Sequence, residues 1–215
     1  MTKFGFFKHG MSVLYLIAFS SLYVQYQGLY GMDGLIPVQN QWQEITTRYQ
    51  DNSWSKKMQE TPNWAWLYSY SSLQNIMSLD LYMEGICCMG IFLSSYLILS
   101  PNHYMGQWMF LVSFYVSLLG LGKTFMSFQW DSLLVEVGFL VILSSKPWRG
   151  EWPVPNSVVW CTRFLCFKLM FMAGVVKIQS HCPTWWKLTA LQYHYATQCL
   201  PTPLAWYAHQ LPVRF

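Results

Sequence analysis

Five long runs of apolar residues constrain the fold more than any other feature of this sequence. They cover approximately residues 11–26, 81–99, 108–126, 130–143 and 158–178. A helix needs about 20 mostly apolar residues to cross a bilayer, and the fourth run approaches that length if Phe128 and Gln129 extend it. The runs are too long and too uniform for alternating barrel strands. The sequence therefore predicts an all-α membrane protein with about five transmembrane helices.

The composition supports a chain whose main solvent is lipid. Only 10% of the residues are charged and 53% are hydrophobic, whereas soluble domains carry roughly 25% charged residues. The net charge of +4 arises from basic residues scattered along the chain, without the basic run or helix face that nucleic acid requires. Membrane lipid is thus an expected partner, and nucleic acid is not.

The polar stretches between the runs predict the domain order. Lys3 and Lys8 precede the first run without an acidic neighbour, which by the positive-inside rule places the amino terminus in the cytosol. The predicted segments are a cytosolic amino terminus at 1–10, a first membrane helix at 11–30, a lumenal aromatic-rich loop at 31–80, a four-helix membrane core at 81–178 and a lumenal Trp/Tyr/Pro-rich tail at 179–215. The loop is expected to be ordered and partly helical. Alternatively, the first run is a secretory signal with the lysines as its n-region.

Several ionisable residues fall inside or beside the fourth and fifth runs. The set comprises Lys123, Asp131, Glu136, Arg163, Lys168 and Lys177. Charges in a bilayer centre cost roughly 2.5–3.5 kcal/mol each on insertion scales, so they are expected to be paired or functional. In antiparallel helices Asp131 would pair with Lys177 and Glu136 with Lys168, with Lys123 as a competitor for Asp131. Such pairs lock helices together, or they line the polar cavity of a membrane enzyme or transporter.

The tail has a distinctive content of aromatic residues, prolines and cysteines. Its histidines at 181, 194 and 209 match no metal-ligand spacing, and no acidic residue follows Glu151, so we predict no catalytic residue, metal or cofactor there. Cys182 and Cys199 could form a disulfide if the tail faces an oxidising lumen, although spacing alone does not fix the pairing. The other four cysteines lie within apolar runs, and we expect them to be small hydrophobic residues buried in lipid.

Three segments resemble a known family. These are Phe128-Gln-Trp-Asp-Ser-Leu-Leu-Val-Glu-Val-Gly-Phe139, the run from Arg163 through Lys177, and the tail from Cys182-Pro-Thr-Trp-Trp to Cys199-Leu-Pro-Thr-Pro203. Together with Tyr30-Gly-Met-Asp-Gly-Leu-Ile-Pro37, they resemble the lipase maturation factors, and the tail is more similar to the second branch of that family. The family's usual acidic residue in the tail motif is replaced here by Ala196.

The resemblance implies a multi-pass membrane protein of the endoplasmic reticulum that assists folding or assembly of secreted lipases such as lipoprotein lipase. It also implies that the chain is not an enzyme. Family members continue well beyond Phe215, so the resemblance predicts that this chain is a fragment, a truncated form or the product of an incomplete gene model. A rigid aromatic surface can cover the apolar surface of an unassembled client, and the candidate contacts are Trp185, Trp186, Tyr193 and Trp206.

Overall fold

The computed structural model describes residues 3–147, 152–200 and 202–210. The predicted amino terminus, membrane core and tail each include some residues outside these ranges. Within them, the secondary structure consists of helices and one isolated β-bridge between Tyr104 and Lys146. The chain divides into two compact units, Met1–Trp160 and Cys161–Phe215.

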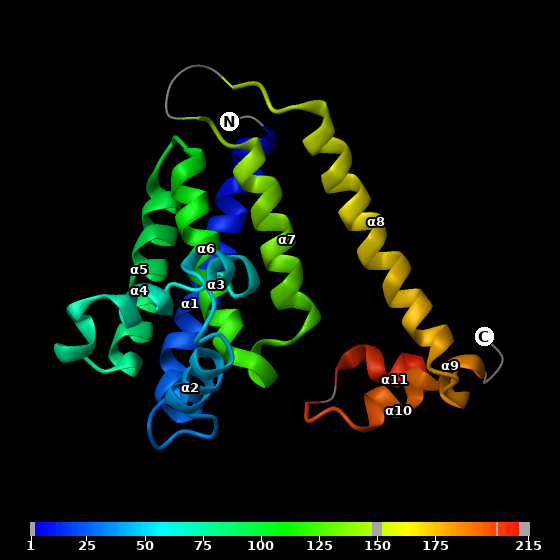
Figure 1. The fold of residues 1–215 in the computed structure, drawn as a ribbon. Coiled ribbons are helices and arrows are strands. Elements are labelled where there is room, and N and C mark those ends of the chain that lie inside the picture. The colour runs from blue at the N-terminus through cyan, green and yellow to red at the C-terminus, as the bar shows by residue number, and fades with distance from the viewer. Residues whose placement is uncertain (1–2, 148–151, 201, 211–215) are drawn as a thin grey trace. The chain divides into compact units, whose positions relative to one another are not determined.

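Four long helices form the frame of the first unit, and they coincide with the first four apolar runs. They are α1 (Lys3–Tyr30), α5 (Leu79–Leu99), α6 (Met105–Gly122) and α7 (Gln129–Ser144). Contacts join α1 to α5, α5 to α6, α6 to α7, and α7 back to α1. Figure 1 shows these four helices running side by side. The shorter elements of the unit are α2 (Val38–Arg48), α3 (Trp54–Glu60), α4 (Ala65–Tyr70), η1 (Ser72–Asn75) and η2 (Lys123–Met126).

Aromatic side chains fill the centre of this bundle, and small residues let its helices approach. Tyr15 and Phe19 of α1 are fully buried and make edge contacts with Tyr115 of α6. A Cβ built on Gly90 of α5 would lie 2.5 Å from the Phe19 ring, and one on Gly138 of α7 would collide with the Tyr15 hydroxyl. Glycine is therefore required where α5 and α7 meet α1, as is common between membrane helices.

Three helical segments among the described residues are long and apolar enough to cross a bilayer. They are Leu79–Leu99, Met105–Met126 and Asn156–Gln179. The other two predicted spans coincide with α1 and α7. At ~1.5 Å per residue, the 16 residues of α7 extend about 24 Å, which is short for a hydrocarbon core of about 30 Å. The first helix is long, but Lys8, Gln25 and Gln27 reduce its apolar character.

The segment between α1 and α5 is ordered and largely helical, as the sequence predicts, and it is fastened to α6. The Asn63 side chain donates to the Ser117 carbonyl at 2.8 Å and accepts from the Ala65 amide at 2.8 Å. The Trp64 amide donates to the Ser117 hydroxyl, and its indole donates to Ser113. Asn63 and Trp64 thus find hydrogen-bond partners in a carbonyl and two hydroxyls of α6.

The second unit begins within α8 (Asn156–Gln179) and continues through three short helices. These are α9 (Pro183–Trp186), α10 (Ala190–Ala196) and α11 (Pro203–His209). Two non-glycine residues with left-handed backbone, His181 (φ 49°) and Leu188 (φ 57°), bound α9 and turn the chain at each of its ends. Among the described residues of these three helices, Ala205 alone is buried.

Candidate functional site

Asp131 is the buried member of the predicted charge cluster in the first unit. It lies in the first turn of α7, where its negative charge is favoured by the helix dipole. Its side chain is 7% exposed, and its Oδ1 accepts a hydrogen bond from the Tyr115 hydroxyl at 2.7 Å. Within the first unit its second oxygen has no hydrogen-bond partner. The role of Tyr115 as the partner of Asp131 was not predicted from the sequence. Nothing in the spacing of an apolar run shows which tyrosine hydroxyl will meet a polar group.

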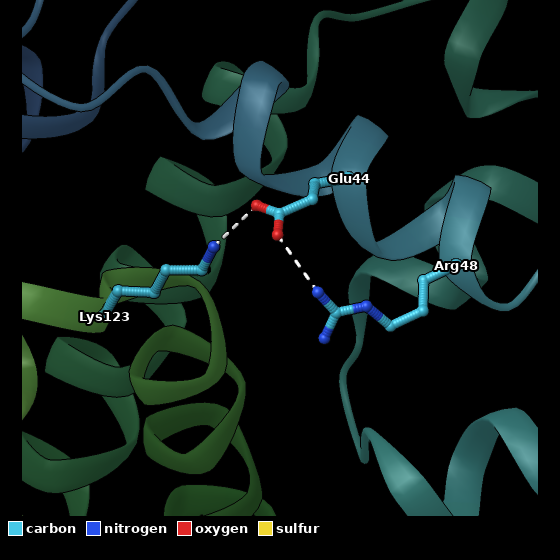
Figure 2. Close-up of polar contacts among 3 residues, drawn as sticks. All are labelled: Glu44, Arg48 and Lys123. Carbon is cyan, nitrogen blue, oxygen red and sulfur yellow. Dashed lines mark hydrogen bonds and ion pairs between the residues drawn. The ribbon is translucent and has the colours of Figure 1, made fainter.

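Lys123 was expected to compete for the Asp131 carboxylate, but in the structure its partner is Glu44. Its ammonium lies 2.8 Å from Glu44, which also contacts Arg48 at 3.2 Å (Figure 2). The reason is that α2 packs against α6 and places Glu44 beside the end of that helix. The hydrogen bond and positive charge of Lys123 lower the pKa of the Glu44 carboxyl, with a smaller effect from Arg48. The three side chains are exposed, so their pairing fixes geometry more than it stabilises the fold.

The remaining charged members lie on exposed positions of two long helices. Glu136 is exposed on α7, and Arg163, Lys168 and Lys177 are exposed on α8. The Lys177 ammonium lies 4.8 Å from the centre of the Trp185 ring, a cation–π contact between the last turn of α8 and α9. The pairing of Asp131 with Lys177 and of Glu136 with Lys168 stays a prediction.

Two large grooves open on the surface of the first unit. The larger, about 1340 Å³, runs along α5 and α6 from Leu81 to Tyr96, and no charged side chain lines it. The smaller, about 640 Å³, lies along α1 and α7. Of the six residues of the predicted charge cluster, only Asp131 lines this smaller groove. Among the described residues, no three His, Cys, Asp or Glu side chains are grouped so that they could hold a metal ion.

A polar cluster that sequence reasoning missed lies at the end of the first unit where α1 begins. The Lys8 ammonium is buried and donates to the Ser144 carbonyl at 2.6 Å. His103 lies in the turn between α5 and α6, 5% exposed, with its Nε2 3.3 Å from Nδ1 of His9. Burial, with smaller effects from His9 and Lys8, lowers the pKa of His103 to about 4. The histidines are 94 positions apart, so no local pattern predicts their contact.

The four aromatic side chains proposed as client contacts all lie at the surface of the second unit. Trp185 is 42% exposed, Trp186 and Tyr193 are each 63% exposed, and Trp206 is 64% exposed. Trp206 is in edge contact with Tyr207 on α11. Large aromatic side chains at this level of exposure are uncommon unless lipid or a protein covers them.

Cys182 and Cys199 are both free thiols in the structure, so the disulfide considered for the tail is not formed there. The Cys182 sulfur lies 2.9 Å from the Thr184 hydroxyl, and this hydrogen bond lowers the pKa of the thiol. Cys87 is buried, as expected of a small hydrophobe, while Cys88, Cys161 and Cys166 are exposed. On helices as apolar as α5 and α8, exposed positions of this kind are suited to contact with lipid.

The helices and their polar groups define a class of protein: an all-α membrane protein whose long helices are apolar on most faces and whose buried polar groups join helices to one another. Its sequence matches the model of the lipase maturation factor transmembrane domain over residues 3–215. The chain belongs to the lipase maturation factor family.

Curated relatives agree with this assignment. The chain is 45% identical to lipase maturation factor 2 of Xenopus laevis, with 96% of this chain and 29% of the relative covered. It is 39% identical to human lipase maturation factor 2, with 96% of this chain and 30% of the relative covered. It is 30% identical to human lipase maturation factor 1, with 94% and 35% covered. The chain thus spans about a third or less of the length of these relatives. No solved structure matches it.

Proposed function

We propose that this chain acts as the membrane platform of a maturation factor for secreted lipases in the endoplasmic reticulum. Family membership over residues 3–215 is the observation that carries the proposal. The names of the relatives refer to lipase maturation, which makes a homodimeric lipase such as lipoprotein lipase the client to test. No enzymatic step is assigned to the chain.

In this proposal all five long helices cross the bilayer, with the amino terminus in the cytosol and with the loop 31–80 and the tail 179–215 in the lumen. Lys3 and Lys8 before the first span support this orientation by the positive-inside rule. The loop and tail then lie on the side of the membrane where secreted lipases fold.

The proposed mechanism is shielding of apolar client surface. A lipase subunit before assembly exposes apolar surface that promotes aggregation. Flat, rigid aromatic side chains cover such a surface at a low entropic cost, and each also carries a polar group that remains compatible with water. The exposure of Trp185, Trp186, Tyr193 and Trp206 supports their assignment as the client contacts.

The decisive experiment measures secretion of active lipoprotein lipase from cells that lack endogenous maturation factors. The 215-residue chain is compared with a full-length relative at equal expression. Rescue by the chain is expected if client handling lies within these helices and their lumenal segments. If the relative restores secretion and the chain does not, the activity requires parts of the relatives that this chain does not cover.

A second experiment tests the placement of the client contact. The variant with alanine at Trp185, Trp186, Tyr193 and Trp206 is expected to lose co-precipitation of the client. A matched control replaces Phe92 and Phe139, which are 74% and 57% exposed on α5 and α7, and it should retain the client. Undiminished capture by the quadruple variant would overturn the placement.

A further inference from the structure

The three short helices after α8 lack an apolar core of their own. They contain four, seven and seven residues, and isolated helices of this length are marginal in water. Among their described residues Ala205 is the only buried one, whereas Leu191, Leu204 and Tyr207 are 50%, 67% and 65% exposed. Helices with so little internal burial need an external apolar surface to lie against.

The chain itself places these helices next to such a surface. The segment α8 is long and apolar enough to cross a bilayer and ends at Gln179, and α9 begins at Pro183. The left-handed residue His181 turns the chain sharply between them, and the contact of Lys177 with the Trp185 ring holds α9 against the last turn of α8. The layer that surrounds the end of a membrane span is the interface between hydrocarbon and water.

The side chains of the three helices have the chemistry of that layer. Tryptophan and tyrosine concentrate at membrane interfaces, where their rings are apolar and their N–H or O–H groups meet water and headgroups. No acidic residue follows Glu151 in the sequence, and Lys177 and Lys187 supply positive charge on both sides of α9. Basic residues near a membrane are attracted to the phosphate groups of lipids.

We propose that α9, α10 and α11 are docked in the interfacial layer of the bilayer, with Leu188, Leu191, Leu204 and Tyr207 inserted among the lipids. These four side chains are separate from the four aromatic residues assigned to the client. The inference rests on α8 as a membrane span and is independent of which client the chain serves. Docking in this layer holds the client-contact residues at the membrane surface.

Photo-crosslinking in liposomes of the full chain tests the docking. The variants Leu191→benzoylphenylalanine and Tyr207→benzoylphenylalanine are compared with two controls. These are Phe167→benzoylphenylalanine at an exposed position of the apolar α8 and Asp51→benzoylphenylalanine in an exposed polar turn. Mass spectrometry then measures lipid adducts in the absence of any client. Adducts at Leu191 and Tyr207 comparable with those at Phe167, and none at Asp51, are expected. Adducts at Phe167 alone would overturn the proposal.

Hydrogen exchange of the unmodified chain in the same liposomes provides a second measurement, which requires no substitution in the chain. Slow exchange of the amides in α10 and α11 is expected if lipid stabilises them, and exchange at the rate of unstructured chain would overturn the docking. The two proposals can fail separately. Client capture without lipid adducts would contradict the interfacial docking alone, while lipid adducts without client capture would contradict the proposed client contact alone.

Discussion

Individual polar residues determine how the loop after α1 is joined to the membrane helices. Asn63 is 4% exposed, and both polar atoms of its side-chain amide form hydrogen bonds. The amide nitrogen donates to the Ser117 carbonyl, and the amide oxygen accepts from the Ala65 backbone amide at the start of α4. A buried polar group is stabilising only while its partners are present, since each lost partner leaves a desolvated group unsatisfied. Asn63 therefore anchors the loop to the helix bundle.

Replacing Asn63 with alanine is expected to lower the free energy of unfolding by about 1–3 kcal/mol, because the Ala65 amide and the Ser117 carbonyl lose their partner. Thermal unfolding of the purified chain in detergent measures the change. Gln43→Ala, at an exposed position of α2, is the matched control and should leave the melting temperature nearly unchanged. Equal melting temperatures for both variants would contradict the role of Asn63.

His103 makes the stability of the bundle depend on pH. Its pKa is lowered to about 4 in the folded chain, whereas an unperturbed histidine titrates near 6.5. As the pH falls from about 6.5 towards 4, the unfolded chain binds a proton that the folded chain does not, so the folded state loses stability. Electrostatic effects of the nearby His9 and Lys8 lower the pKa of His103 in the same direction as burial.

The melting temperature should thus fall between about pH 7 and pH 5, and part of that fall should disappear in His103→Asn, which cannot titrate. Measurements of both proteins across this range in one detergent give the comparison. A pH dependence that is identical in the variant would assign the effect to other groups.

At the scale of elements, the bundle depends on close approach of helices at glycines. Gly90 admits the Phe19 ring between α5 and α1, and Gly138 admits Tyr15 between α7 and α1. The Tyr15 hydroxyl also donates to the Leu134 carbonyl at 2.9 Å. Contact between membrane helices depends on packing and such hydrogen bonds, because lipid is as apolar as the side chains that it replaces.

Gly90→Ala is expected to cost about 1–3 kcal/mol of stability, because the added methyl group overpacks a fully buried ring. Gly85→Ala on the same helix meets nothing within 4 Å, so it serves as a chemically identical control without a penalty. Retention of the native melting temperature by both variants would show that α1 and α5 can separate at little cost.

The sequence-based pairs between the fourth and fifth apolar runs are tested by charge exchange. Asp131→Lys or Lys177→Asp alone should reduce yield and stability in detergent, because each leaves like charges together in a low-dielectric setting. The double exchange should restore both if the residues are partners, and losses that simply add would contradict the pairing. Glu136→Gln and Lys168→Met provide the corresponding test of the second pair.

At the scale of the whole molecule, the sequence predicts where the long helices lie but not how polar side chains pair. The five apolar runs match α1, α5, α6, α7 and α8 closely, because a helix that meets lipid on most faces carries its signal in a continuous stretch of sequence. The partners Lys123 with Glu44 and Tyr115 with Asp131 depend on packing between distant segments. No period or local motif encodes such a contact.

The extensive packing of α1 against α5, with the segment 31–78 between them, has a consequence during synthesis. At a rate of 5–20 residues per second, the ribosome needs roughly 3–14 s to complete α5 after α1 is complete. Throughout that interval the pocket at Gly90 that receives Phe19 does not yet exist. The first helix must therefore remain in the translocon or the bilayer without its principal partner during that interval. A chain proposed to shield the apolar surface of unassembled clients thus passes through an unassembled stage of its own.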